Sequence, residues 1–389
     1  MSDPAGVLVM APNWLGDAVM ALPAVSDVRH AFRSSRLIVA ARQSVADVFT
    51  LVPFVDSFVG LRWSGRIWDR PRFDGDAVQL RECGAEVAIL LPNSFASAWL
   101  VRRAEVPERW GYAGDLRKPL LSRAIGRPPG SMHQGAYYQH LLRELGIHSG
   151  PLEPAVTVSA AAQQAARDYL IGRGWEPSAP LVVFAPGAAY GTAKRWLPRY
   201  VADVASELAR AHGVCSVLVG SRSDAETTRL IMDAVGADVG SRIFDAAGAT
   251  TIETLAGILS LADACVSNDS GAMHLAAAVG TPLVALFGPT NEYETAPLTR
   301  SGRRSVVLTH QVWCRPCMLR ECPIDHRCMK GIAPARVYDA VVRGVRSRNG
   351  ASPDSDPTQT CEPSAVLRDR DLESSRHGGQ IPERPVTGI

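Results

Sequence analysis

Short apolar runs alternate with stretches of helical periodicity along most of the chain. The runs are four or five residues long and rich in Val, Leu, Ile and Ala, which is typical of strands buried on both faces of a parallel sheet. We expect strands at 7–11, 37–40, 87–91, 181–185, 216–220, 264–267 and 283–287, with a helix at 94–103 after the third of them. Strands that alternate with helices in this way predict βαβ units and an α/β fold.

A polar, Ala- and Gln-rich passage near residues 155–175 interrupts this alternation, which then restarts. The restart predicts two Rossmann-like domains that face each other across a cleft, an N-terminal domain at 1–170 and a C-terminal domain at 171–346. Neither half carries G-x-G-x-x-G after its first strand, which disfavours a dehydrogenase and favours an enzyme that binds one nucleotide. Residues 347–389 lack apolar periodicity, and we expect a disordered tail there.

Composition limits the location and the partners of the protein. Of the 389 residues, 46% are hydrophobic and 21% are charged, which suits a globular protein of two domains. The formal net charge of +2 is too small to favour a nucleic-acid partner. No basic segment precedes the first apolar run, and that run is far shorter than a membrane span. We therefore expect a cytoplasmic protein without a transmembrane segment.

The stretch 267–274, with the sequence SNDSGAMH, is the most informative part of the chain. It follows an apolar strand, and the small residues Ser270 and Gly271 open an apolar helix. The unpaired backbone N–H groups and the positive dipole end of such a helix form an anion site, which suits a nucleotide diphosphate. A plain helix cap by Asp269 or Ser270 is the alternative interpretation.

Two further strand ends carry candidates for chemistry. Asp17 follows the first strand near the start of an apolar helix, where a carboxylate either caps the helix or acts as a general base for an attacking hydroxyl. Lys194 lies in the Gly-rich turn that opens the second half, next to Arg195. Its ammonium suits the charge that develops on a departing diphosphate, and a solvated surface lysine is the alternative.

Together these motifs resemble the lipopolysaccharide heptosyltransferases of glycosyltransferase family 9, particularly the heptosyltransferase II branch. The resemblance covers residues 7–345 in the same order and implies a GT-B fold. It rests on Gly16-Asp17 with Leu22-Pro23-Ala24, the PGA and AKRW motifs within 186–196, the stretch 267–274, Phe287-Gly288-Pro289-Thr290, and a cysteine cluster that ends in Arg327-Cys328-Met329. It implies an inverting glycosyltransferase that moves heptose from ADP-L-glycero-D-manno-heptose to a heptose of the lipopolysaccharide inner core.

The resemblance also implies roles for single residues. Asp17 corresponds to the catalytic base, in an N-terminal domain that binds the acceptor. Lys194 corresponds to the cation at the donor diphosphate, in a C-terminal domain that binds the nucleotide sugar. Asp269, Ser270 and Gly271 correspond to the donor-binding turn, with backbone amides on phosphate and Asp269 near the transferred sugar.

Two further donor-site candidates have structural alternatives of equal weight. His274 lies one turn into the donor-binding helix, where helix packing explains a histidine at least as well. Thr250 belongs to the stretch that flanks adenine in members of the family. With Glu253, however, Thr250 also fits a capping box, which we favour.

An inverting transfer needs one base and a stabilised leaving ADP, so we expect no cofactor in catalysis. Four cysteines nevertheless cluster near the C-terminal end of the second domain, at Cys314, Cys317, Cys322 and Cys328. They supply enough soft ligands for a structural zinc ion or an iron–sulfur cluster, although their spacing is irregular for a zinc ribbon. Reduced thiols are the other interpretation in a reducing compartment.

The acceptor that the resemblance implies is the anionic core–lipid A molecule at the inner membrane surface. Arg62, Arg66 and Arg70 alternate with aromatic residues, a mixture that suits phosphate groups at a headgroup layer and a peripheral location on the membrane. A solvated loop with Trp68 turned inward is the alternative. Two other functions stay open: a GT-B transferase or epimerase that uses another nucleotide sugar, and a decayed nucleotide- or metal-binding protein.

Overall fold

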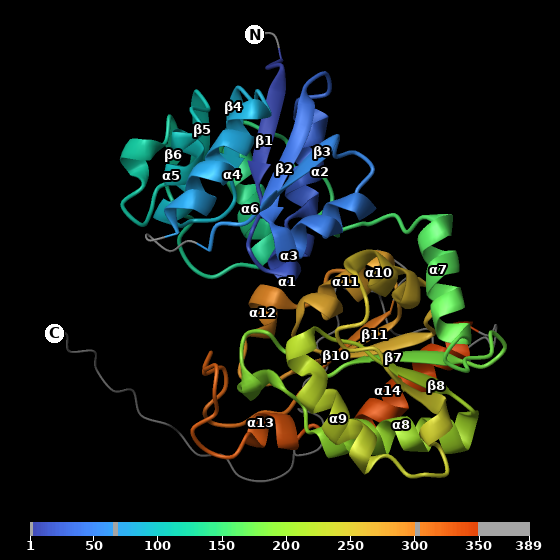
Figure 1. Cartoon of the computed structure of the whole chain (residues 1–389). Coiled ribbons are helices and arrows are strands. Elements are labelled where there is room, and N and C mark those ends of the chain that lie inside the picture. Colours follow the sequence, from blue (N-terminus) through green and yellow to red (C-terminus); the bar gives the residue numbers. More distant parts are fainter. Residues whose placement is uncertain (1–2, 65–68, 300–303, 349–389) are drawn as a thin grey trace, which may run out of the picture.

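Two parallel six-stranded sheets, each covered by helices, form the protein (Figure 1). The computed structural model describes residues 3–64, 69–299 and 304–348. The strand order is β3-β2-β1-β4-β5-β6 in the first sheet and β12-β11-β10-β7-β8-β9 in the second. Each sheet therefore starts at a central strand, adds two strands on one side and then three on the other, which is the doubly wound Rossmann order. The predicted α/β architecture of two Rossmann-like units is confirmed.

The first sheet consists of β1 (Gly6–Met10), β2 (Arg36–Arg42), β3 (Ser57–Leu61), β4 (Val87–Leu90), β5 (Glu108–Tyr112) and β6 (Arg123–Ile125). Its helices are α1 (Leu15–Met20), α2 (Leu22–Ala31), α3 (Gln43–Ala46), α4 (Arg70–Glu82), α5 (Phe95–Arg103) and α6 (Gln134–Glu144), with short 3-10 turns η1 (Asp47–Leu51) and η2 (Lys118–Leu120).

The second sheet consists of β7 (Leu181–Ala185), β8 (Cys215–Leu218), β9 (Ile243–Asp245), β10 (Ala264–Asn268), β11 (Leu283–Phe287) and β12 (Ser305–Thr309). Its helices are α7 (Ala160–Ile171), α8 (Pro198–His212), α9 (Ala225–Ala234), α10 (Ile252–Leu261), α11 (Gly271–Val279), α12 (Glu292–Thr295), α13 (Arg327–Lys330) and α14 (Pro334–Arg348), with 3-10 turns η3 (Thr192–Lys194), η4 (Arg222–Asp224) and η5 (Gly240–Arg242).

The seven predicted strands are confirmed, each within two residues of its expected bounds. The predicted helix at 94–103 is α5, for which Ser94 is the cap: its side chain accepts a hydrogen bond from the backbone N–H of Ser97 at 3.3 Å. The sequence did not predict β3, β5, β6, β9 and β12. Their burial is incomplete, so they lack the continuous apolar run of a central parallel strand.

The polar passage near 155–175 folds as α7, which packs on α10. A methyl group on Gly257 of α10 would lie 2.5 Å from the Ala162 carbonyl oxygen and 2.7 Å from Ala166 Cβ, so this contact requires glycine. At the other end, α14 continues to Arg348 and thus occupies the first two residues of the predicted tail. Residues 349–389 lie outside the described residues. Among the described residues, every helix falls short of the length and apolarity of a bilayer-spanning segment.

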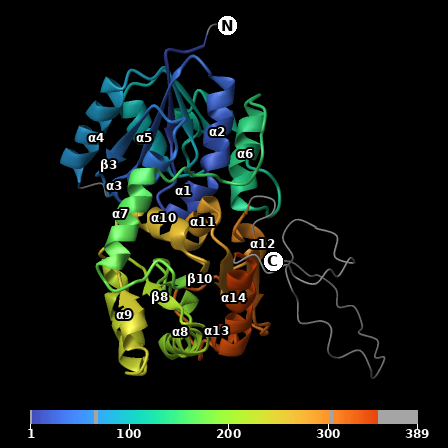
Figure 2. The same ribbon diagram turned by 90° about the vertical axis from the view of Figure 1, so that its right-hand side faces the viewer.

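The two halves meet through α1 and α11, which lie between the sheets in both views (Figures 1 and 2). Helix α1 follows β1 and α11 follows β10, so the carboxyl edges of two central strands lead to the same place. One hydrophobic cluster extends through both halves and includes Val19 and Met20 from one and Met273 and Leu275 from the other. The halves thus share an apolar core at this contact.

Two glycines allow the first turns of α1 and α11 to approach closely. A methyl group on Gly271 would lie 2.7 Å from Leu15 Cβ, and one on Gly16 would lie 2.8 Å from His274 Cδ2. Real Cβ atoms do not tolerate such distances in a close-packed interior. Any larger residue at either position must therefore separate the helices.

Substituting Gly271→Ala is expected to lower the free energy of unfolding by about 1–3 kcal/mol, because overpacking forces α1 and α11 apart. Urea denaturation measures this change. The matched control is Gly75→Ala in the exposed face of α4, where nothing lies within 4 Å of the new methyl group. That control should raise stability by roughly 0.5–1 kcal/mol. A neutral Gly271→Ala variant would contradict the steric argument.

Candidate active site

Asp17 lies in the first turn of α1, directly at the contact between the halves. Trp14, with an extended backbone, is the N-cap residue of this helix, so Asp17 does not serve as the cap. Burial raises the pKa of Asp17 to about 6, the negative charge of Asp269 adds to the effect, and the positive charge of Lys194 opposes it. A carboxylate with such a pKa is a competent general base near neutral pH.

Asp269 and Lys194 form a buried ion pair in the second half. The Lys194 ammonium lies 2.6 Å from Asp269 Oδ2, and the two side chains are 12% and 6% exposed. Thr290 donates a second hydrogen bond from its hydroxyl to the same oxygen at 2.7 Å. Lys194 also lies 4.9 Å from the centre of the Tyr190 ring. Lys194 is therefore not a solvated surface lysine, and Asp269 turns toward it.

Asn268 fixes the loop that carries Lys194 against the end of β10. Its amide nitrogen donates to the carbonyl of Pro186 at 2.6 Å, and its amide oxygen accepts from the backbone N–H of Trp196 at 3.2 Å. The two bonds thus hold both ends of the 186–196 loop, with Lys194 between them. Asn268 is buried, so water does not compete for these bonds.

The start of α11 has no side-chain cap. Ser270 is the N-cap residue, but its hydroxyl makes no capping bond and instead lies 3.1 Å from the hydroxyl of Ser267. Asp269 is engaged by Lys194 and does not cap the helix either. The helix-cap interpretation of 269–270 is therefore wrong, and the first backbone amides of α11 keep the donor capacity that suits an anion.

His274 lies beneath Gly16 and is 4% exposed. Burial lowers its pKa to about 4, the charge of Asp269 opposes this, and His133 and Lys194 lower it further. The imidazole is therefore neutral at physiological pH. It packs on the first turn of α1 while it lies within electrostatic reach of the Lys194–Asp269 pair.

Thr250 is not the cap of α10. The N-cap residue is Thr251, whose side chain accepts from the backbone N–H of Thr254 at 3.1 Å. The capping box predicted at Thr250 and Glu253 is thus wrong by one residue, because a second threonine follows the first. Thr250 itself is partly buried ahead of the helix.

The basic and the aromatic side chains of the stretch after β3 differ in burial. Arg62 and Arg70 are exposed, and Arg66 lies outside the described residues. Trp63 and Phe73, in contrast, are buried, with ring centres 4.7 Å apart, and Phe73 stacks on Trp99 at 4.2 Å. The described aromatic side chains of this stretch therefore belong to the core, whereas Arg62 and Arg70 face outward, and Trp68 lies outside the described residues.

A second contact joins the halves at the start of α6. The imidazole of His133 accepts at Nδ1 from the backbone N–H of Gly135 at 3.1 Å, and its Nε2 lies 2.9 Å from the carbonyl oxygen of Ala296. Ser131 donates to the Glu294 carboxylate at 2.6 Å. Sequence reasoning missed these residues, as it missed Thr290 and the 53% exposed Trp14. None of them lies at a sequence spacing that predicts a site, although Thr290 belongs to the motif Phe287-Gly288-Pro289-Thr290 on which the family resemblance rests.

The four clustered cysteines do not form a ligand set. Cys314, Cys317 and Cys322 are partly buried and Cys328 is buried, and none of them forms a disulfide. Within 3–64, 69–299 and 304–348, no three His, Cys, Asp or Glu side chains are grouped as ligands of a metal ion. Burial raises the pKa of the Cys328 thiol, the backbone of Met329 opposes this, and the nearby Cys314, Cys322 and Cys317 raise it further.

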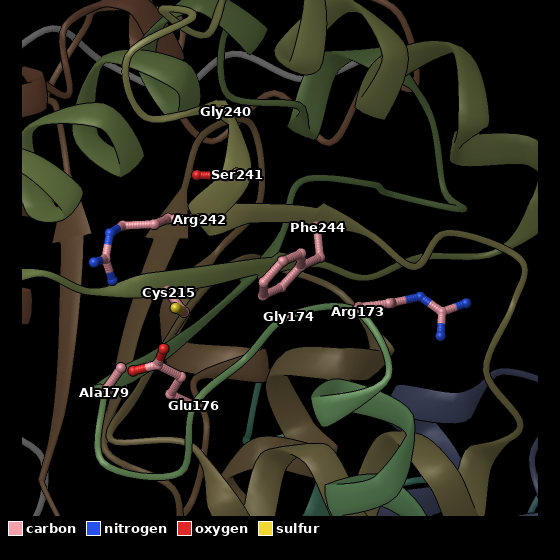
Figure 3. A pocket seen from close by; sticks show the side chains of 9 residues that line it. All are labelled: Arg173, Gly174, Glu176, Ala179, Cys215, Gly240, Ser241, Arg242 and Phe244. Atoms are coloured by element: carbon pink, nitrogen blue, oxygen red, sulfur yellow. The ribbon is translucent and has the colours of Figure 1, made fainter.

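A cavity of about 490 Å³ lies elsewhere in the second half, at the amino ends of β8 and β9. Cys215, Glu176 and Phe244 surround it (Figure 3). None of the predicted site residues lines this cavity. Doubly wound sheets bind ligands at the carboxyl ends of their strands, so we place the site at Asp17 and the Lys194–Asp269 pair instead.

Comparison with known proteins agrees with this fold. Two Rossmann-like halves that meet at the carboxyl ends of their central strands form the GT-B fold of a class of glycosyltransferases. The solved structure described as E. coli ADP-heptose lps heptosyltransferase II superimposes with a TM-score of 0.75 and 25% identity, covering 89% of this chain and all of that one. The profile of glycosyltransferase family 9 (heptosyltransferase) matches residues 77–327. The chain belongs to this family.

Two curated relatives are similar over most of their length. Lipopolysaccharide heptosyltransferase 2 of Salmonella typhimurium is 30% identical over 309 residues, which cover 76% of this chain and 86% of that protein. Lipopolysaccharide heptosyltransferase 2 of Escherichia coli is 28% identical over 306 residues, with the same coverage.

The rate of glycosyl transfer should rise with pH through about 6 and level off above it, because Asp17 accepts a proton only in its ionised form. Steady-state kcat/KM, measured from roughly pH 4.5 to pH 8 so that the range includes the expected pKa of about 6, follows this limb. Asp269→Asn should move the limb to lower pH, since it removes a negative charge, and Lys194→Met should move it to higher pH.

Asp17→Asn should lower kcat by about 10²- to 10⁴-fold and abolish the limb. The matched control is Asp115→Asn, at a carboxylate that is 53% exposed in the first half, and it should leave the profile unchanged. A normal pH profile in the Asp17→Asn variant would refute the assignment of the base.

Proposed function

We propose that the protein is an inverting heptosyltransferase that moves heptose from ADP-heptose onto a heptose of the lipopolysaccharide inner core. The observation that carries the proposal is the meeting of a carboxylate of raised pKa from one half with a buried lysine and an uncapped helix start from the other. The names and the similarity of the relatives supply the donor and the acceptor class.

In this proposal the reaction is a single displacement. Asp17 takes the proton of an acceptor hydroxyl while that oxygen bonds to the anomeric carbon of the donor, and the bond from that carbon to ADP breaks with its electron pair on ADP. Lys194 and the amides at Ser270 and Gly271 stabilise the negative charge that develops on the diphosphate. Asp269 faces the transferred sugar. Every step uses side chains or backbone of this chain.

In this proposal the two domains have different roles. The N-terminal domain, predicted at 1–170, presents the base and binds the acceptor, and the C-terminal domain, predicted at 171–346, holds the donor. Helix α7 packs on α10 and so belongs with the C-terminal half. His274 and Thr250 complete the donor side. The neutral imidazole of His274 supports the first turn of α1, and Thr250 lies in the turn between β9 and α10 at the carboxyl edge of the sheet.

The acceptor side is the exposed edge around Asp17. Trp14 precedes Asp17 by three residues, so the two lie on the same side of the first helical turn, and its indole is 53% exposed. An exposed aromatic ring beside the base suits the apolar face of a sugar. The exposed Arg62 and Arg70, together with Arg66, suit the phosphates of core–lipid A. We place the protein in the cytoplasm, at the inner surface of the inner membrane.

The two alternatives have less support. A transferase or epimerase that uses another nucleotide sugar is disfavoured because the family profile and both curated relatives describe heptosyltransferases. A decayed binding protein is disfavoured because the base, the lysine and the uncapped helix are all present in one place.

Calorimetric titration tests the donor. ADP and ADP-heptose should bind, and UDP and GDP should bind roughly tenfold or more weakly. A site built for adenine leaves polar groups unpaired when it holds uracil or guanine, and this lowers the affinity. Lys194→Met should weaken ADP binding by about 10- to 100-fold, as expected for a lost charge-assisted hydrogen bond. The matched control is Lys330→Met at an exposed lysine of α13, which should bind ADP normally.

Transfer assays then test the acceptor. Core–lipid A that carries one heptose should accept a second, and heptose-free core should not. Preference for UDP or GDP would overturn the donor assignment, and transfer to the heptose-free acceptor would overturn the acceptor assignment. Binding of ADP-heptose without any transfer would favour the decayed protein.

We further propose that the clustered cysteines are reduced thiols. In the described part of the chain their side chains are not grouped as ligands of a metal ion, and none of the four forms a disulfide. Elemental analysis of the purified protein should find substoichiometric zinc and iron, and a chelator should not change the rate. Stoichiometric zinc, or the absorption bands of an iron–sulfur cluster, would contradict this proposal.

A further inference from the structure

The segment 310–328, which contains the four clustered cysteines, lies against both loops that hold Asp269. On one side, the carbonyl of Arg320 accepts from the backbone N–H of Ala193 at 3.0 Å, and the Tyr190 hydroxyl donates to the carbonyl of Met318 at 2.8 Å. On the other side, the backbone N–H of Met318 donates to the carbonyl of Pro289 at 3.0 Å. The segment thus connects the loop of Lys194 with the turn after β11.

The Arg315 side chain forms the buried centre of this connection. Its guanidinium pairs with the Glu292 carboxylate at 2.7 Å, and the two side chains are only 3% and 7% exposed. Arg315 also donates through Nε to the carbonyl of Gly288 at 2.6 Å and through Nη2 to the carbonyl of Thr290 at 3.3 Å. One side chain therefore holds three successive points of the turn 288–292.

The turn 288–292 and the helix α12, which starts at its end, make two contacts that the proposed function uses. From its middle, Thr290 donates to the Asp269 oxygen that also receives Lys194. From its end, α12 supplies Glu294 and the carbonyl that follows the helix to the contact with the N-terminal half. A displacement of the turn would move Asp269 and loosen the approach of the two halves together.

We propose that Arg315 is a positioning residue of the transfer reaction, which fixes the turn 288–292 so that Thr290 holds Asp269 toward the donor sugar and α12 meets the N-terminal half. The inference rests on the proposed donor role of Asp269. Arg315 acts through the turn and touches neither substrate.

The chemistry of the side chain explains why arginine is required here. A planar guanidinium presents five N–H donors in a fixed fork, so it engages a carboxylate and two carbonyls from one position. Lysine offers a single point charge with a flexible stem and cannot reproduce this geometry. A buried ion pair adds little net stability to a fold. We therefore attribute the pairing of Arg315 with Glu292 to its effect on the position of the turn and not to stability.

The decisive variant is the double substitution Arg315→Met with Glu292→Met. It removes both charges and keeps similar volume, so the chain should remain folded, whereas either single substitution leaves an uncompensated buried charge. In the folded double variant, kcat/KM for ADP-heptose should fall about 10- to 100-fold, because a shift of about 1 Å in a reacting group has an effect of this size. The KM for the acceptor should change less than kcat.

Ligand binding separates positioning from general loosening. Calorimetry should show that the double variant loses most of the difference in affinity between ADP-heptose and ADP, because Asp269 faces the sugar, while ADP itself binds nearly as in the parent protein. Equal weakening of both ligands would refute the proposal. So would a parent-like kcat/KM in a double variant that unfolds cooperatively.

Two controls complete the test. Arg327→Met changes a partly exposed arginine of the same segment, paired with Asp325 at 3.0 Å, and should leave the kinetics unchanged. Arg315→Lys, which keeps the charge and loses the fork, should resemble the double variant in its affinity ratio. If the parent protein itself fails to bind ADP-heptose or to transfer heptose, the proposed function fails. If the parent succeeds and the double variant matches it, only the role of Arg315 fails.

Discussion

The contact between the first turns of α1 and α11 is the constraint on which the rest of the structure depends. It exists because Gly16 and Gly271 carry no side chain where His274 and Leu15 approach them. Two helix starts that meet this closely bring the ends of two sheets, more than 250 residues apart in sequence, to one point. Both are positive dipole ends, so the place where they meet favours negative groups. The two candidate active-site carboxylates, Asp17 and Asp269, lie at this point, and at Asp17 burial outweighs the dipole and raises the pKa.

Electrostatics then distinguishes the two carboxylates. Asp269 has its lysine and its threonine at hydrogen-bond distance, whereas Asp17 has neither and is left with burial and a like charge nearby. The lysine and the threonine fix the position of the Asp269 carboxylate. Asp17 is buried without such partners, so its pKa rises to about 6 and it exchanges its proton near neutral pH. The different partners of the two aspartates fit the two different roles in the proposed function.

Sequence alone predicts the parts of this protein that depend on local patterns. Central strands such as β1 and β10 are buried on both faces and show as apolar runs, and the positions of Asp17 and Lys194 at strand ends follow from them. Edge strands such as β6 lack that signal. The pairing of Lys194 with Asp269, the hydroxyl of Thr290 and the contact of His133 with Ala296 join segments that only the tertiary fold brings together. Even the cap of α10 differs from the prediction by one residue, because two threonines follow each other and the side chain of the second accepts the bond from Thr254.

In the proposed donor site, the pairing of Lys194 with Asp269 also has a consequence for selectivity. The Lys194 ammonium already has a carboxylate at 2.6 Å and a nearby aromatic ring, so an anion that binds there must compete with a partner that belongs to the protein. A small anion such as inorganic phosphate would gain only that one lysine and the amides of one helix in exchange. A nucleotide sugar would gain contacts along its whole length. In the proposed site, the internal ion pair would thus favour nucleotide sugars over simple phosphates.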